Sequence, residues 1–314
     1  MSIKLGVVMD PIETIRPNKD TTFAMLLAAQ NEGWQIHYVE QHDLFLKNGS
    51  VQAHMHQLKV TDDNEHWFEI LDSKTRDASF CDVILMRKDP PFNMEYIYTT
   101  YLLELIEKNG TLIINKPQSL RDANEKLFTA WFPEICPRTI VTSKMNLLKD
   151  FLVVEKDIIV KPLDGMGGQS IFRIKVGDPN TNVIFEEMTA RNKKNIMAQQ
   201  YISEVVAGDK RVIMIDGNPI PYALARLPAS NETRANLAAG GKGIVQTLSS
   251  RDLHICEIVG ETLREKGLLF VGLDIIGDYL SEINVTSPTC IREIDAGANV
   301  NIGEHFINCI KRYL

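Results

Sequence analysis

The sequence has little cysteine, and its cysteines form no pattern that would build a covalent framework. The five cysteines stand at positions 81, 136, 256, 290 and 309, and no Cys-x-x-Cys pair occurs. Disulfide scaffolds and zinc knuckles need even numbers of closely spaced cysteines. The pattern therefore argues against both and predicts a reducing, cytoplasmic setting.

Long apolar runs and an excess of positive charge are also missing. No hydrophobic stretch approaches the roughly 18 residues that span a bilayer, and Met1–Gly6 has the pattern of a strand rather than of a signal peptide. The 34 Lys and Arg residues are outnumbered by 41 Asp and Glu residues, which gives a net charge of −7. Non-specific binding to nucleic acid or to anionic membranes needs the opposite sign. We therefore expect no nucleic-acid and no membrane partner.

Two common nucleotide-binding motifs are absent as well. A P-loop requires Gly-Lys-Ser/Thr after its glycines, and the dinucleotide fingerprint Gly-x-Gly-x-x-Gly opens a helix. The glycine-rich segment Asp164–Gly168 is instead followed by residues 169–174, which alternate as in a strand. This disfavours a Rossmann dehydrogenase.

The first third of the chain alternates strand patterns with helix patterns. The length of 314 residues corresponds to about two domains, and 44% hydrophobic residues suffice for real cores. Asp20 and Asn93 can cap the first two helices, and Gly33 and Gly110 can end them. The alternation predicts an α/β domain with a doubly wound parallel sheet, and we place its end near residue 122.

Polar residues follow several of the predicted strands. In a doubly wound sheet ligands bind beyond the carboxyl ends of strands, which directs attention to Asp10, to residues 87–89 and to residues 115–116. Residues 46–76 are polar and carry no clear pattern. The His54-x-His56 pair in this segment could ligate a metal, but a solvated strand is favoured because no further ligand is close in the sequence.

From about residue 120 hairpins replace crossovers, so the C-terminal part is predicted to be α+β. Hairpin turns are predicted near Gly165, at Asp216-Gly217 and at Gly277-Asp278. Ser119 is expected to cap a helix that runs to Phe132 and carries Lys126. Residues 228–243 are a long polar stretch, which is typical of a functional loop.

The turn Asp164–Gly168 is the first chemical signal. A glycine-rich hairpin turn exposes backbone N–H groups that can cover phosphates, as in protein kinases. Lys161 stands on the strand that enters this turn, where its ammonium can reach phosphate oxygens. A plain flexible turn is the competing interpretation.

An acidic hairpin is the second and stronger signal. Glu282 and Asn284 are two residues apart and share a face of one strand, and Asp274 joins that face if it pairs with Glu282. We expect this register to need a three-residue turn, because a two-residue turn would pair Asp274 with Ser281. Oxygen ligands of this kind suit Mg²⁺, whereas the alternative is a solvated acidic face.

Four arginines lie in the segments that flank these two signals. They are Arg211, Arg226, Arg234 and Arg292. Guanidinium groups could neutralise a transferred phosphoryl group and hold substrate carboxylates. The alternative for each is a surface charge.

Six sequence blocks together resemble the bacterial glutathione synthetases, within the ATP-grasp superfamily. The likeness runs from about residue 3 to residue 294, is weak between residues 46 and 80, and does not reach the last 20 residues. The blocks are Met86–Phe92, Asn115–Asp122, Asn124–Trp131, Lys161–Gly168, Val271–Gly277 and Glu282–Glu293.

This resemblance implies an N-terminal substrate-side domain, residues 1–122, and an ATP-grasp domain, residues 123–314. The second domain would divide into a lid subdomain at about 123–200 and a C-terminal subdomain at about 201–314. The implied reaction is ATP-dependent ligation of γ-glutamylcysteine to glycine through an acyl phosphate. A cytoplasmic homotetramer is implied as well.

The resemblance also implies roles for individual residues. ATP would be held by its phosphates and its adenine at Lys126, Lys161, Gly165, Met166, Gly167, Gly168, Gln199, Gln200, Tyr201 and Ile202. Mg²⁺, with Mn²⁺ as the alternative ion, would be carried by Asp274, Glu282 and Asn284. Arg211, Arg226 and Arg234 would face the substrate or the acyl phosphate, and residues 228–243 would form a lid.

Three other functions remain open at this stage. Another ATP-grasp carboxylate–amine ligase or a small-molecule kinase would use the same glycine turn, lysine and metal ligands. A non-catalytic nucleotide-binding regulator should have lost the charged side chains, yet Lys126, Lys161, Glu282 and Asn284 are all present.

Overall fold

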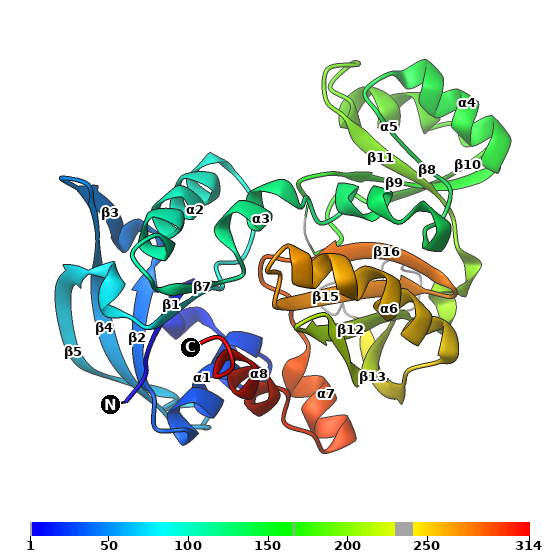
Figure 1. Cartoon of the computed structure of the whole chain (residues 1–314). Coiled ribbons are helices and arrows are strands. Elements are labelled where there is room, and N and C mark those ends of the chain that lie inside the picture. The colour runs from blue at the N-terminus through cyan, green and yellow to red at the C-terminus, as the bar shows by residue number, and fades with distance from the viewer. Residues whose placement is uncertain (1, 166, 230–240) are drawn as a thin grey trace.

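The computed structural model describes residues 2–165, 167–229 and 241–314, which form three sheets with flanking helices (Figure 1). The N-terminal sheet has seven strands in the order β3-β4-β2-β1-β6-β7, with β5 paired to β4. Its strands are β1 Lys4–Met9, β2 Gln35–Glu40, β3 Leu44–Lys47, β4 Ser50–Val60, β5 Phe68–Asp77, β6 Val83–Met86 and β7 Leu112–Ile114. Strands β1, β2, β6 and β7 are parallel, which confirms the predicted α/β class.

Strands β3, β4 and β5 add an antiparallel extension that the sequence left unassigned. Apolar residues alternate along β4, but β5 is largely exposed on both faces and carries no such pattern. The ring nitrogens of His54 and His56 on β4 bond the hydroxyls of Thr75 and Ser73 on β5. The two histidines therefore belong to a solvated strand, as expected.

Two helices cover each face of the N-terminal sheet. The helices α1 (Thr21–Asn31) and α8 (Ile302–Ile310) bury one face, and α2 (Met94–Glu107) and α3 (Pro117–Asp122) lie against the other. The predicted caps are confirmed, because Asp20 accepts from Phe23 N at 2.6 Å and Asn93 accepts from Tyr96 N at 3.0 Å.

The predicted helix from Ser119 to Phe132 is wrong. Helix α3 begins at Pro117, and the hydroxyl of Ser119 inside it donates to the carbonyl of Lys266. The chain leaves the helix after Asp122, and the side chain of Asn124 then accepts from Lys126 N and Leu127 N. That asparagine starts a separate 3₁₀ turn, Leu127–Trp131, so Lys126 lies just before a short turn rather than within a helix.

The second sheet forms a lobe with its own core. Its order is β10-β9-β11-β8, and helices α4 (Met145–Glu155) and α5 (Thr181–Met188) pack on it. The strands are β8 Thr139–Thr142, β9 Asp157–Pro162, β10 Phe172–Lys175 and β11 Ile196–Gln200. The predicted hairpin around the glycine turn is confirmed as the antiparallel pair β9 and β10.

The third sheet is antiparallel in the order β14-β13-β12-β15-β16. Its strands are β12 Asp209–Ile215, β13 Asn218–Leu227, β14 Lys242–Thr247, β15 Phe270–Ile276 and β16 Tyr279–Asn284. Helix α6 (Ser250–Glu265) covers one face and α7 (Ile291–Ala298) the other, and two hydrophobic cores run on from here into the N-terminal sheet. Both predicted hairpins are confirmed.

The turn of the acidic hairpin differs from the prediction. Ile276 pairs with Tyr279, so the turn has two residues, yet Asp274 still pairs with Glu282 because a β-bulge at Ser281 shifts the register by one. The expectation that a two-residue turn would separate the acidic cluster is therefore wrong, although the cluster itself forms.

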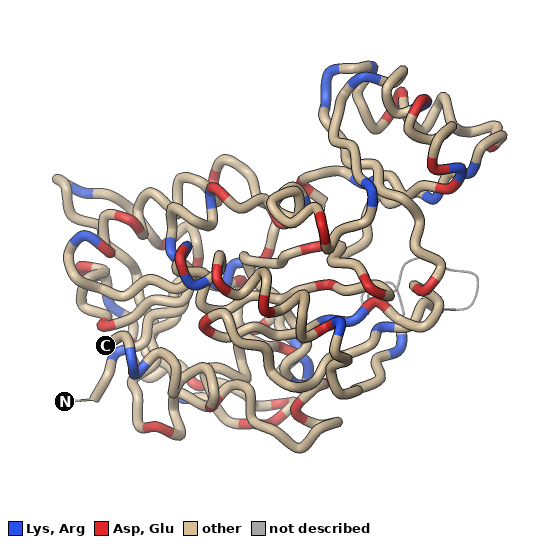
Figure 2. Tube along the Cα trace, turned by 45° about the vertical axis from the view of Figure 1, so that its right-hand side comes forward, with Lys and Arg blue, Asp and Glu red and all other residues tan. Residues whose placement is uncertain are grey.

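Two further features bear on partners. Basic and acidic residues are interspersed along the whole described trace (Figure 2). Within residues 2–165, 167–229 and 241–314, no helix has the length and apolar character needed to cross a membrane.

Candidate active site

A cavity of about 320 Å³ opens between the second and third sheets, with Asp89 and Pro90 of the N-terminal domain at its wall. The residues to which the resemblance gives a role in binding or catalysis line this cavity wherever the structure describes them. They are Lys126, Lys161, Gly165, Gly167, Gly168, Gln199, Gln200, Tyr201, Ile202, Arg211, Arg226, Asp274, Glu282 and Asn284. Met166, Arg234 and most of the segment 228–243 lie outside the described residues.

The glycine turn and Lys161 form one end of the cavity. Gly167 and Gly168 have φ values of 61° and 81°, a left-handed backbone conformation that residues other than glycine rarely adopt. Lys161 on β9 is 6% exposed, and its ammonium donates to the carbonyl of Ser281 at 3.1 Å. Burial lowers the pKa of Lys161, and the neighbouring Glu282 counteracts this effect. The bulge at Ser281 thus turns a carbonyl toward the lysine.

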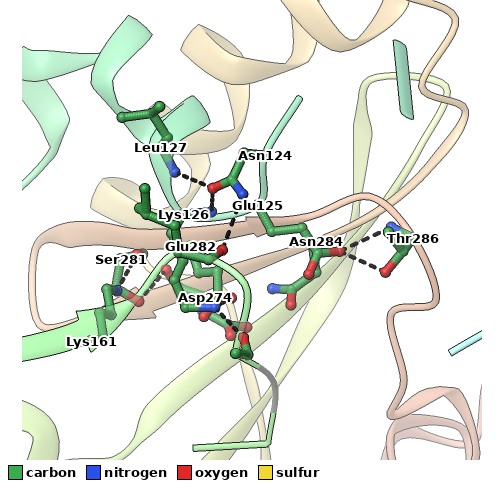
Figure 3. A network of polar contacts seen from close by, with 12 residues as sticks. Asn124, Glu125, Lys126, Leu127, Lys161, Asp274, Ser281, Glu282, Asn284 and Thr286 are labelled. Carbon is green, nitrogen blue, oxygen red and sulfur yellow. Dashed lines mark hydrogen bonds and ion pairs between the residues drawn. The ribbon is translucent and has the colours of Figure 1, made fainter. Parts of the chain in front are cut away.

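Lys126 links the glycine turn to the acidic hairpin. Its ammonium donates to the carbonyl of Gly165 and lies 3.1 Å from Glu282 Oε1 (Figure 3). The ammonium groups of Lys126 and Lys161, which come from different segments, therefore both contact strand β16. Such a pair gives the positive charge that phosphate oxygens need.

Asp274 lies in a buried network with two arginines. Arg211 binds it in a bidentate manner at 2.6 and 3.1 Å, and Arg226 lies 3.0 Å from Asp274 and 2.6 Å from Asp209. Burial alone would raise the pKa of Asp274, but the two guanidinium groups outweigh it and hold this pKa well below its usual range. Burial raises the pKa of Asp209 to about 6, opposed by Arg226.

The oxygen atoms available to a metal come mainly from β16. Both oxygens of Asp274 are engaged by arginines, whereas Glu282 and Asn284 face the cavity, with Asn284 Nδ2 bonded to the carbonyl of Gly272 at 3.2 Å. No cluster of three or more His, Cys, Asp or Glu ligands occurs among the described residues. One carboxylate and one amide oxygen still suit Mg²⁺, which usually takes one or two carboxylates and completes its shell with phosphates and water.

The far end of the cavity is less polar. Gln199, Gln200, Tyr201 and Ile202 continue from β11, and Ile159, Ile171, Val205 and Ile276 add apolar surface. The guanidinium of Arg173 stacks on the ring of Tyr201 at 3.5 Å and pairs with Asp157. A flat aromatic base fits such a wall.

Sequence reasoning missed several cavity residues. Asp209 directly precedes Lys210-Arg211, and Glu125 lies inside one of the resembling blocks, so both carried a signal. Residues 286–290 also line the cavity. Arg292, by contrast, lies outside it and pairs with Asp62.

Two solved synthetase structures share this fold. The structure resembles D-cycloserine synthetase DcsG with a TM-score of 0.68 at 13% identity, covering 99% of both chains. It also resembles D-alanyl-alanine synthetase A from Vibrio cholerae with a TM-score of 0.60 at 12% identity, covering 99% of this chain and 98% of that one. At such low identity the likeness shows the fold alone. The class comes from a family model: residues 125–299 match the ATP-grasp domain of prokaryotic glutathione synthetases, so the chain is an enzyme of the ATP-grasp class.

Sequence comparison then gives the family. The family model of the prokaryotic glutathione synthetase N-terminal domain matches residues 3–121, and that of the ATP-grasp domain matches residues 125–299. Glutathione synthetase of Pseudomonas syringae pv. tomato is 56% identical over 314 residues, covering 100% of this chain and 98% of the relative. That of Coxiella burnetii is 55% identical over 307 residues, covering 98% and 96%. The chain belongs to the prokaryotic glutathione synthetase family and is an ATP-dependent ligase.

Proposed function

We propose that this chain joins γ-glutamylcysteine to glycine, with conversion of ATP to ADP and phosphate, and so makes glutathione. One observation supports this most strongly: a single cavity gathers two lysines at a glycine turn, an acidic strand and two buried arginines. The full-length identity to curated glutathione synthetases selects the substrates among those that the class accepts.

The chemistry needs an activated carboxylate. A carboxylate is a poor electrophile, so phosphoryl transfer from ATP first converts the carboxylate of γ-glutamylcysteine into an acyl phosphate. Lys126 and Lys161 would neutralise the phosphate oxygens during this transfer, and the glycine turn would cover them with backbone N–H groups. Gln199, Gln200, Tyr201 and Ile202 would hold the adenine.

A divalent ion completes this charge compensation. Glu282 and Asn284 would hold Mg²⁺, or Mn²⁺ as the alternative, with Asp274 behind them. When bound, this ion supplies Lewis-acid stabilisation of the phosphoryl group.

Glycine then replaces the phosphate. Its amine attacks the acyl carbon, and Arg211 or Arg226 would stabilise the oxyanion that forms, with Arg234 proposed as a further contact. Asp274 keeps the first two guanidiniums in place, since it contacts both. We propose that residues 228–243 act as a lid, because the acyl phosphate must be kept from water.

The organisation of the chain follows the same proposal. A substrate-side domain at residues 1–122 would precede an ATP-grasp domain at residues 123–314, divided near residue 200. We propose a homotetramer, which sedimentation analysis can test. A cytoplasmic location is supported by the five free cysteines, of which four are buried.

A coupled assay of ADP release tests the reaction. ADP should appear only when γ-glutamylcysteine and glycine are both present, and each omission should stop it. Release of ADP without glycine, with accumulation of a phosphorylated product, would instead indicate a small-molecule kinase. Full activity with another amine would indicate a different ATP-grasp ligase.

A further inference from the structure

Glu125 stands beside the site without a role in the chemistry described so far. Its Oε1 accepts three hydrogen bonds from the two residues that follow strand β16, from Val285 N at 2.9 Å, Thr286 N at 3.0 Å and Thr286 Oγ1 at 2.8 Å (Figure 3). Its main-chain carbonyl accepts a fourth, from Ile283 N at 2.9 Å. One residue thus holds three of the four positions from Ile283 to Thr286.

Two of these positions adjoin the side chains that face the phosphate end of the cavity. Ile283 lies between Glu282 and Asn284, and Val285 follows Asn284 directly. On the other side, Glu125 precedes Lys126, whose ammonium contacts both Glu282 and the carbonyl of Gly165. The position of Lys126 relative to Glu282 and Asn284 therefore depends on the contacts of Glu125.

The charge of Glu125 is costly at this place, which argues that the contact is functional. Burial and repulsion by Glu282 raise its pKa, and the bonds from Thr286 only partly offset this. The charge of the neighbouring Lys126 opposes this rise as well, but less than burial and Glu282 cause it. The value of Glu125 lies in one acceptor oxygen on which three donors from two residues converge.

We propose that Glu125 is a positioning residue, which clamps the end of β16 and so sets the distance between Lys126 and the Glu282–Asn284 pair. This inference rests on the proposed function. The clamp predicts that Glu125 acts through the position of its acceptor oxygen and not through its charge. An amide oxygen has two lone pairs, as each carboxylate oxygen has, and can receive the same donors. Glutamine should therefore substitute for glutamate, and alanine should not.

Two variants separate these possibilities, with Glu104→Gln as a matched control for loss of a carboxylate that pairs with Arg121 away from the cavity. Glu125→Ala should lower kcat about 10- to 100-fold and raise the Mg²⁺ concentration for half-activation by about 10-fold. Glu125→Gln should stay within about threefold of the parent, as should Glu104→Gln.

Other results overturn the proposal. If Glu125→Ala keeps its kcat and its Mg²⁺ dependence while melting earlier, the role is structural. If Glu125→Gln is as slow as Glu125→Ala and the pH–rate profile loses a limb, the residue acts through its charge. Should Glu125→Ala fail to fold, Thr286→Val removes one of the three bonds and should lower kcat about threefold or more with unchanged melting; parent kcat in that variant then refutes the clamp.

Binding measurements keep this result separate from the proposed reaction. Calorimetry of ADP with and without Mg²⁺ needs neither γ-glutamylcysteine nor glycine. Weaker Mg²⁺-dependent binding in Glu125→Ala supports the clamp even if the parent protein ligates a different substrate, and unchanged binding contradicts it.

Discussion

The network around Asp274 allows one prediction to be worked out in detail. In the variant Asp274→Asn, Arg211 loses its only carboxylate among the described residues, whereas Arg226 keeps Asp209 at 2.6 Å. Asp274 and both arginines are at most 5% exposed, so water cannot replace the lost charge. Breaking a buried ion pair costs about 3–5 kcal/mol. Since asparagine retains one acceptor oxygen, we expect a loss of about 3 kcal/mol.

A second ion pair in this chain supplies the control. Asp157 and Arg173 have the same bidentate geometry, at 3.0 and 2.6 Å, but both side chains are more than a quarter exposed. Exposed pairs contribute about 0–1 kcal/mol. Asp157→Asn should therefore change stability by less than 1 kcal/mol, which isolates burial as the cause of the larger effect.

The assay is urea unfolding of the ligand-free protein in the presence of EDTA, followed by circular dichroism. Removing divalent ions ensures that lost metal binding cannot lower the stability of Asp274→Asn. Equal unfolding midpoints for this variant and the parent would refute the argument from burial. If that variant is stable but needs far more Mg²⁺ for activity, Asp274 acts mainly as the metal ligand that the family resemblance implies.

Three further predictions concern other residues. Glu282→Gln should abolish turnover at low Mg²⁺ with an unchanged melting curve, and near-normal activity there would contradict the proposed metal role. Lys161→Ala should raise the KM for ATP and lower kcat, because its ammonium would act on the phosphates in both ground and transition states; a variant with parent kinetics would make Lys161 a structural residue. Burial, aided by the charges of Arg76 and Lys4, lowers the pKa of His37 to about 4 in the folded protein. In the unfolded chain this pKa is near 6.5, so the unfolded chain binds the proton first as the pH falls. Stability from this residue should be complete above pH 6.5 and fall by about 2–3 kcal/mol toward pH 4, and urea midpoints of His37→Phe should lack that decline.

Local signals in the sequence predicted much of this fold. Asp20 and Asn93 act on backbone N–H groups three residues away, so their sequence neighbourhood suffices to place the starts of α1 and α2. The same holds for the hairpin at Asp216-Gly217, where a two-residue turn joins β12 and β13. The cavity residues followed from similar short patterns together with the family resemblance.

Features that depend on distant contacts could not be predicted in this way. Strand β5 is exposed on both faces, so its pairing with β4 leaves no apolar alternation to detect. The bulge at Ser281 shows only in the register of two strands. The two arginines that engage Asp274 come from β12 and β13, at least 48 residues earlier in the chain.

The docking of α8 against α1 has a consequence for synthesis of the protein. Gly303 lies so close to α1 that a Cβ atom there would stand 2.8 Å from the carbonyl oxygen of Ala24. A ribosome adds about 5–20 residues per second, so the roughly 270 residues between these helices take about 15–50 s to make. During that interval the apolar residues of α1 that pack against α8 in the finished protein lack this partner helix. The first sheet to be translated is therefore among the last parts of the molecule to be closed.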